Sequence, residues 1–282
     1  MHWLTTRQQI TLKSEQHGFT LIEMIIVIVI GGIVASMTAS VLTLPIKAYV
    51  DNSRRASLTD SAESTLRRMQ RDIQSALPNS IRITADGQSL ELLHVVDGGR
   101  YRSQLASDGS GDLLDFSLAD TQFDVLGSLL NFSNISLGNN AIVVYPLAST
   151  GSNAYTADNT AIISNSSTAS HVVFSSFQFP LQSPQKRFFV IDGPITYRCN
   201  TTATAAKNKT LMRYQGYNIQ ASQANPPSSG AAIQSNYISD CNFSYNSGSS
   251  IRSGLVTIDL RLTDETGESI HLTQQVHVSN QP

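Results

Sequence analysis

The sequence lacks the short motifs that mark the common catalytic sites. Its 282 residues contain no GxSxG nucleophile elbow, no HExxH zinc helix, no P-loop and no GxGxxG turn. No pair of carboxylates has a spacing that would hold both groups at one site. We therefore expect that the protein is not an enzyme, and that it has no catalytic residue and no cofactor.

Cysteine is scarce, which excludes the usual zinc-binding modules. The only two cysteines, Cys199 and Cys241, form no CxxC motif and have no cluster of metal ligands beside them. In an exported chain an even cysteine count favours one disulfide, although two unrelated buried thiols remain the alternative. A disulfide closing this loop would stabilise the fold by about 4 kcal/mol on the chain-entropy estimate.

One acidic loop resembles the start of a calcium site but departs from its pattern. Residues 108–112, Asp-Gly-Ser-Gly-Asp, begin like a calcium-binding loop. The sixth position, where glycine is required, is Leu113, and the twelfth, where a glutamate ligand is required, is Ala119. We expect a flexible turn here and no metal site in the chain.

Net charge is small, so a polyanionic partner is not indicated. The formal net charge is −2, whereas nucleic-acid binding is favoured by a basic surface. Arginines at positions 54, 55, 67, 68 and 71 are interleaved with acids, including a Glu63–Arg67 pair at i,i+4 spacing. Without aromatic residues among them there is no base-stacking platform, so no nucleic-acid partner is expected.

Charge is nearly absent from residues 19–46, where Glu23 is the only ionised side chain. Phe19 to Leu44 would span about 39 Å as a helix, enough to cross the hydrocarbon core of a bilayer. The preceding residues 1–18 are polar and basic, and no small-residue cleavage site follows the apolar run. The positive-inside rule predicts a cytoplasmic leader, with residues after Lys47 outside.

Glu23 needs an explanation, because a carboxylate at membrane depth costs about 2.5 to 3.5 kcal/mol. Cleavage between Gly18 and Phe19 would create a cationic amine four residues before it. An acid in the first turn also complements the positive end of the helix dipole. The alternative is a helix-end glutamate that extends to the lipid headgroups.

The stretch Gly18-Phe19-Thr20-Leu21-Ile22-Glu23, followed by the apolar run, resembles the class III signal of type IV pilins and pseudopilins. The resemblance implies a prepilin peptidase that cuts after Gly18 and methylates Phe19. It also implies that Glu23 pairs with a terminal amine during filament assembly. Many major pilins have a helix-bending proline near the position of Ser40, whereas the first proline here is Pro45. The resemblance therefore does not extend to the local melting of this helix that major pilins show.

Further segments resemble the MshO-type biogenesis proteins of mannose-sensitive haemagglutinin (MSHA) pili. They are residues 90–102, LELLHVVDGGRYR, residues 113–127, LLDFSLADTQFDVLG, and the closing QVHVSNQP. The likeness implies a low-abundance minor pilin that starts assembly in the inner membrane with other minor and major pilins and sits at the filament tip. The PilW-type minor pilins and the J pseudopilin of type II secretion are more distant likenesses; a glycan-binding tip adhesin is a further alternative.

Beyond the membrane segment, residues 50–77 continue the helical pattern and Pro78-Asn79 ends it. One arc of about 100° collects the apolar side chains, and the charged ones lie opposite. This arc is expected to dock on the head, and its members are Leu58, Ala62, Leu66, Met69, Ile73 and Leu77.

After Pro78 the pattern predicts strands. They are 81–83, 89–96, 142–146, 171–179, 188–191, 195–199, 211–214 and 241–245, with a turn at Asp192-Gly193-Pro194 between two of them. The polar stretches 148–170 and 221–236 are predicted to be loops. Residues 256–262 and 270–278 alternate as a half-buried antiparallel hairpin, which leaves His271 and His277 facing solvent.

These patterns predict an α+β fold, in which a long N-terminal helix packs on a mainly antiparallel β-sheet head. The expected parts are a leader (1–18), a transmembrane helix (19–46), its amphipathic extension (47–78) and the head (79–282). We expect an inner-membrane protein with a cytoplasmic N-terminus and a periplasmic head, which reaches the cell surface after assembly.

Overall fold

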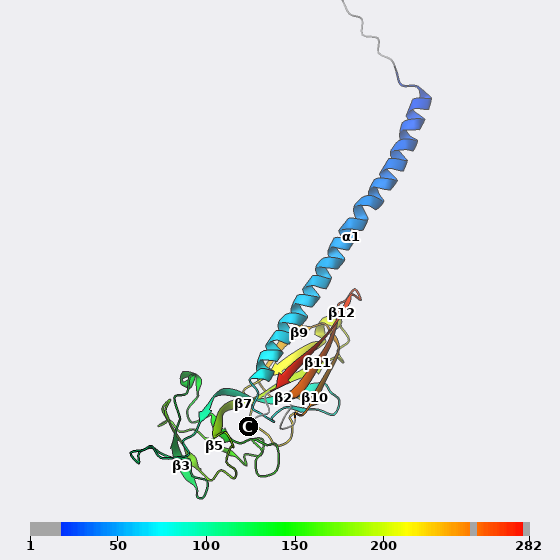
Figure 1. Ribbon diagram of the computed structural model, residues 1–282. Coiled ribbons are helices and arrows are strands. Elements are labelled where there is room, and N and C mark those ends of the chain that lie inside the picture. The colour runs from blue at the N-terminus through cyan, green and yellow to red at the C-terminus, as the bar shows by residue number, and fades with distance from the viewer. Residues whose placement is uncertain (1–17, 249–252, 279–282) are drawn as a thin grey trace, which may run out of the picture. The chain divides into compact units, whose positions relative to one another are not determined.

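The computed structural model describes residues 18–248 and 253–278. Most of the expected leader, and the last residues of the closing QVHVSNQP segment, lie outside these ranges. The chain divides into two compact units, Met1–Ser53 and Arg54–Pro282. The α+β class is confirmed, since one long N-terminal helix precedes antiparallel sheets (Figure 1).

The helix α1 covers Leu21–Gln74 and includes Pro45. Proline lacks the backbone N–H that would bond the carbonyl four residues earlier, yet the helix continues past it. In the described part of the chain, α1 is the one helix long and apolar enough to cross a membrane. In the part of α1 that belongs to the first unit, all described side chains are exposed, including the apolar ones.

The second part of α1 buries the apolar arc predicted from the sequence. Leu58, Leu66, Met69 and Ile73 lie in the main core of the head, and Ala62 lies between them. On the opposite face Arg67 pairs with Glu63 at 2.9 Å, both side chains being largely exposed. The amphipathic pattern is therefore confirmed for this part of the helix.

The helix ends at Gln74, three residues before the predicted end at Leu77. The residue before a proline avoids the helical conformation, and Pro78 applies this restriction to Leu77. The N–H of Leu77 instead donates to the carbonyl of Leu93, and that of Val95 donates to the carbonyl of Ser75. Sheet bonding thus replaces the last helical turn, while the Leu77 side chain stays buried.

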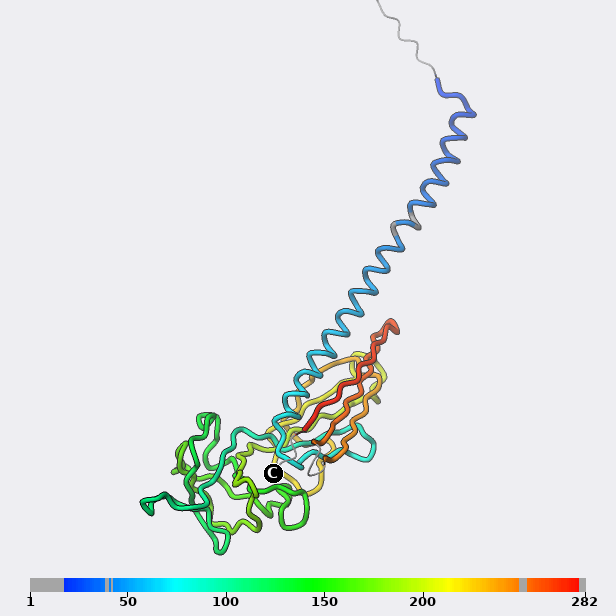
Figure 2. Tube along the Cα trace, in the orientation of Figure 1, coloured from blue at the N-terminus to red at the C-terminus, as the bar shows by residue number. Residues whose placement is uncertain are grey.

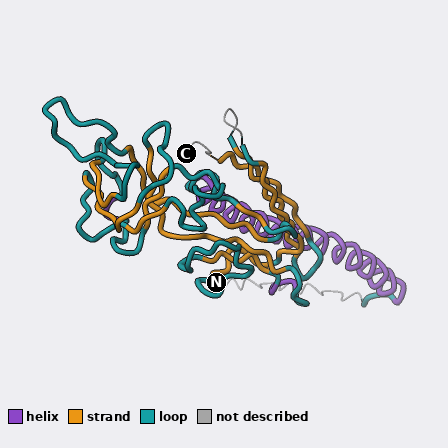
Figure 3. The backbone as a smooth tube through the Cα atoms, turned by 90° about the horizontal axis from the view of Figure 1, so that it is seen from below, coloured by secondary structure: helices purple, strands orange, loops and turns teal. Residues whose placement is uncertain are grey.

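In the described part of the head, the strands form three antiparallel sheets. The seven-stranded sheet consists of β1 (Arg82–Ile83), β2 (Ser89–Arg100), β7 (Arg187–Asn200), β4 (Ala141–Val144), β5 (Thr160–Ile162), β8 (Thr210–Tyr214) and β9 (Ala231–Asn236). The three-stranded sheet consists of β10 (Ile238–Asn246), β11 (Gly254–Thr263) and β12 (Ser269–Val278). The smallest sheet pairs β3 (Asp120–Asp124) with β6 (His171–Phe177), and long loops join these elements (Figure 3).

The predicted turn at Asp192-Gly193-Pro194 is wrong, because β7 runs through it as one strand of 14 residues. The pairing passes from His94↔Gly193 to Val95↔Ile191, so Asp192 is an extra residue in a β-bulge. The other edge of β7 is free of ladder partners between Ile191, where β4 pairs, and Thr196, where β8 pairs. A bulge at this interval accommodates the proline without ending the strand.

Three strands were not predicted, and two of them lie in stretches predicted to be loops. β5 falls within 148–170 and β9 within 221–236. β9 reads Ala-Ala-Ile-Gln-Ser-Asn, a composition with little strand preference. Its position is set by tertiary contacts, since Thr65 of α1 donates to the carbonyl of Gln234 at 3.2 Å.

The predicted C-terminal hairpin is confirmed as β11 and β12. Val256, Ile258, Leu260 and Leu262 of β11 are fully buried, and His271 and His277 of β12 are exposed. These strands lie beside the second part of α1 (Figure 2). The Gln274 side-chain amide donates to Gln70 Oε1 at 2.6 Å. The apolar face of the second part of α1 is thus covered by strands from both larger sheets.

Cys199 of β7 and Cys241 of β10 form a disulfide with a Cα–Cα distance of 6.4 Å. The bond links the seven-stranded sheet to the three-stranded sheet, and both cysteines are buried in the core that covers α1. It closes a loop with a sequence separation of 42 residues. The covalent link thus supplements apolar packing where the two sheets meet.

Replacing both cysteines by serine should destabilise the head. Opening this loop removes up to about 4 kcal/mol from the free energy of unfolding. Urea denaturation of the full-length chain in detergent micelles, followed by tryptic sensitivity, would measure the loss. Wild-type protein under reducing conditions should approach the double variant; an unchanged midpoint would contradict a stabilising role.

The bulge predicts a pH dependence. The ring Nδ1 of His94 lies 2.9 Å from Asp192 Oδ1, and this hydrogen bond raises the pKa of His94. Because the folded-state pKa is raised, the stabilisation is present below pH about 6.5 and is lost as the pH rises through the folded-state value. Asp192→Asn should therefore lower the thermal midpoint at pH 6 more than at pH 8.5, whereas the exposed-site control His277→Gln should show no such trend.

Candidate assembly site

The start of α1 carries a helix cap next to the candidate assembly residues. The backbone N–H of Glu23 donates to the Thr20 hydroxyl at 3.3 Å, and that of Met24 donates to the Thr20 carbonyl at 3.2 Å. Thr20 is thus the N-cap, and Glu23 occupies the third helical position of a Thr-x-x-Glu sequence. Thr20 was not among the predicted site residues, although the Thr-x-x-Glu spacing is a capping signal that the sequence contains.

Gly18 and Phe19 lie immediately before this cap and outside the helix. Phe19 is 85% exposed, and a side chain built at Gly18 would meet no atom within 4 Å. As far as the described residues show, the peptide bond between Gly18 and Phe19 is therefore accessible. A processing enzyme could reach it without unwinding α1.

Glu23 lies in the first turn of α1, where the free N–H groups favour a negative charge. Among the described residues no basic side chain forms an ion pair with it. Its neighbours Ile22, Met24 and Ile26 are apolar and about half or more exposed. The carboxylate is thus the single charge of residues 21–46, a segment of α1 whose side chains suit an apolar environment.

Apolar side chains cover the first part of α1 on all sides. From Leu21 to Ile46 the described large hydrophobic residues are 48 to 79% exposed, whereas one-sided exposure is typical of a helix on a soluble core. In this segment the Thr38 hydroxyl is bonded within the helix, donating to the Val34 carbonyl at 2.8 Å. This segment is built to be surrounded by lipid or by other apolar helices.

The comparison with protein families identifies the same segment. The family model described as the prokaryotic N-terminal methylation motif matches residues 13–39. The motif indicates a type IV pilin-like protein, processing by a prepilin peptidase and assembly with other pilins. No curated protein and no solved structure matches the chain.

Two buried ionic groups hold the head in place, and the first joins α1 to the large sheet. The Asp72 carboxylate accepts hydrogen bonds from the Tyr197 hydroxyl and the Arg213 guanidinium, each at 2.7 Å. Burial, together with the Asp72 charge, raises the pKa of Tyr197, which stays a neutral donor. This contact fixes the last turns of the helix against β7 and β8.

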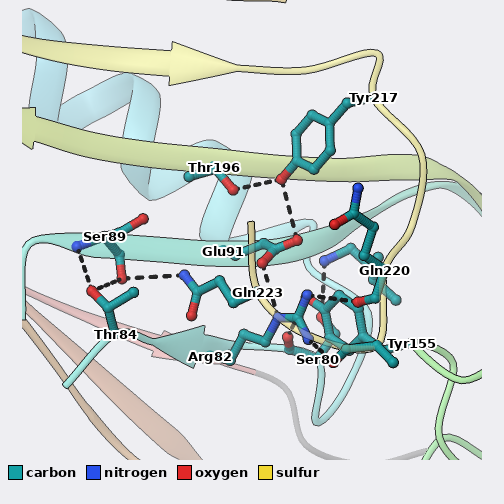
Figure 4. A network of polar contacts seen from close by, with 12 residues as sticks. Ser80, Arg82, Thr84, Ser89, Glu91, Tyr155, Thr196, Tyr217, Gln220 and Gln223 are labelled. Atoms are coloured by element: carbon teal, nitrogen blue, oxygen red, sulfur yellow. Dashed lines mark hydrogen bonds and ion pairs between the residues drawn. The ribbon is translucent and has the colours of Figure 1, made fainter. Parts of the chain in front are cut away.

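The second group lies on the opposite face of β2 (Figure 4). Glu91 is fully buried; it accepts from the Arg82 guanidinium at 2.9 Å and from the Tyr217 hydroxyl at 3.2 Å. Arg82 also donates to the carbonyls of Gln220 and Ala221. Together these bonds hold the loop between β8 and β9 against the sheet.

Arg82 is further constrained by Tyr155, which comes from a distant loop. Its guanidinium carbon lies 3.7 Å from the centre of the Tyr155 ring, a cation–π contact. The Tyr155 hydroxyl donates to the Ser80 carbonyl at 2.8 Å, and burial raises the pKa of Tyr155 well above its usual range. Residues from three loops thus converge on one ion pair.

Neither ionic group resembles a catalytic or metal site. Among the described residues no cluster of three or more His, Cys, Asp or Glu side chains could hold a metal ion. At the rejected calcium loop, the Ser110 hydroxyl and backbone N–H both donate to Asp108. Of the site residues predicted from the sequence, Gly18, Phe19 and Glu23 lie together at the start of α1, and Cys199 and Cys241 lie in the head.

Replacing Glu91 by glutamine should destabilise the head, because the partly exposed Arg82 would lose its counter-charge. Losing one partner of a fully buried pair typically costs about 3 to 5 kcal/mol, which is an upper bound here because Arg82 keeps some contact with water. Urea denaturation of the full-length chain would measure the loss. The exposed Glu63→Gln control should change stability by less than about 1 kcal/mol, and equal effects of the two substitutions would refute the assignment.

Proposed function

We propose that the protein is a minor pilin of a type IV pilus similar to MSHA pili. Its leader is removed between Gly18 and Phe19, and the new terminal amine of Phe19 is methylated. The observation that carries this proposal is the start of α1, where Glu23 lies within the matched motif and is the one charged residue of the exposed, apolar segment 21–46.

In the proposed assembly step, Glu23 pairs with the terminal amine of a neighbouring subunit. Bringing the two charges together removes the cost of holding a lone carboxylate in lipid. The Thr20 cap supports this role, since it starts the helix directly after Phe19 and keeps Glu23 in the first turn. The amine and the carboxylate are then both at the same end of each subunit.

The domain proposal follows the same division of the chain. Residues 1–18 form the leader, 19–46 cross the inner membrane, 47–78 extend the helix and 79–282 form the head. The N-terminus is cytoplasmic and the head is periplasmic before assembly. The exposed apolar surface of residues 21–46 supports the membrane segment.

We further propose that the subunit initiates filaments with other minor pilins and is located at the tip, where it supports surface attachment. The segments similar to MshO-type proteins, residues 90–102 and 113–127, support this more specific role. They contain most of β2 and all of β3, so the likeness extends into the head. The large loop-rich head also supports a tip position. A tip places fewer packing restrictions on a subunit than a repeated shaft position does.

Glu23→Ala should strongly reduce surface pili while leaving the amount of protein in the membrane unchanged. Electron microscopy would count pili, and immunoblotting of membrane fractions would measure the protein. Glu63→Ala, an exposed acid on the same helix, is the matched control and should leave piliation normal. Normal piliation in the Glu23 variant would refute the assembly role.

Deletion distinguishes the pilin from a type II secretion pseudopilin. Loss of a minor pilin should abolish pili and attachment, while exported enzymes still reach the medium. Retention of those enzymes in the periplasm, with attachment preserved, would favour the pseudopilin instead.

A further inference from the structure

Two arginines face each other at the end of the β2–β7 ladder. Arg100 is directly opposite Arg187 in the antiparallel register. Arg100 is exposed and Arg187 is half-buried. Within residues 18–248 and 253–278, the hydrogen bonds and ion pairs of the head include none from either guanidinium.

This arrangement is unfavourable without an anion. Like charges directly opposite on neighbouring strands destabilise a sheet. Arginine does not relieve the repulsion by losing its proton, since its pKa exceeds about 12. Two planar guanidinium groups at cross-strand distance instead offer several N–H donors to one carboxylate, a geometry suited to bidentate binding.

The arginines border an open depression of about 530 Å³. Gly98 and Phe189 are opposite each other in the same ladder. Gly98 is two residues from Arg100, and Phe189 is two residues from Arg187. All four residues therefore lie on the same face of the sheet. A Cβ atom at Gly98 would lie 3.4 Å from the Phe189 ring. The absence of a side chain at Gly98 therefore leaves space in the depression above this ring. Leu126, half exposed, adds an apolar wall.

The one carboxylate that lines the depression is already occupied. Asp97 is 9% exposed and accepts from the backbone N–H groups of Gly98 and Asn131, at 2.8 and 2.7 Å. It forms no ion pair with Arg100 or Arg187. The unsatisfied charge of the depression is therefore positive.

We propose that Arg100 and Arg187 bind the carboxylate of an acidic sugar. The concave volume suits one or two sugar rings, and Phe189 with Leu126 offers the apolar surface that a ring's C–H groups contact. A nucleic acid is less suited, because Phe189 is the one partly exposed aromatic ring among the described lining residues, whereas single strands stack successive bases on several rings. The proposal concerns the head alone and does not depend on filament assembly.

Saturation-transfer NMR with the full-length chain in detergent micelles tests the site. The probes are D-galacturonic acid and its neutral counterpart D-galactose. The acid should bind and the neutral sugar should not. Arg100→Gln and Arg187→Gln should each weaken binding at least tenfold, whereas Arg68→Gln, an exposed arginine on α1, should leave it unchanged.

Thermal unfolding without ligand separates this role from a structural one. Removing one of two repelling arginines should keep or raise the midpoint, and a clear drop in either variant would overturn the proposal. Equal binding of acetate or sulfate would indicate an adventitious ion only. Tighter, arginine-dependent binding of a polyglutamate peptide or of single-stranded DNA would also overturn the assignment to a sugar.

Discussion

The contact on which the rest of the head depends is the burial of one apolar stripe of α1. Residues such as Leu66 and Met69 contribute to a core that also contains side chains of β2, β7, β8 and β10–β12. Each sheet would otherwise expose an apolar face to water. The helix therefore covers the apolar faces of both larger sheets, and the Asp72 contact and the disulfide add to this packing.

Much of this fold could be predicted because the spacing of apolar residues along the chain indicates which side chains are buried. The stripe on α1 and the alternation in β11 both match the buried residues. Prediction failed where nonlocal contacts decide the outcome. Asp192-Gly193-Pro194 has the composition of a turn, but pairing with β2 on one side keeps β7 continuous. β9 is a strand because β8 and α1 bind its backbone, which its own residues do not indicate.

At the candidate assembly site the sequence was informative because the requirement is local. A glutamate within an apolar run is unusual by itself, and the capping pattern of Thr20 needs only four consecutive residues. The arginine pair of the head could not be predicted in the same way. Arg100 and Arg187 are far apart in the sequence, and only the register of β2 with β7 places them opposite each other.

The position of the disulfide has a mechanical consequence. A pull on the N-terminal end of the chain reaches the head through residues 54–74, which contact both large sheets. If the head yielded, the segment between Cys199 and Cys241, with a sequence separation of 42, could not extend until the covalent bond was reduced. The joint between the sheets thus limits how far the chain can lengthen under load, whatever the strength of the noncovalent packing around it.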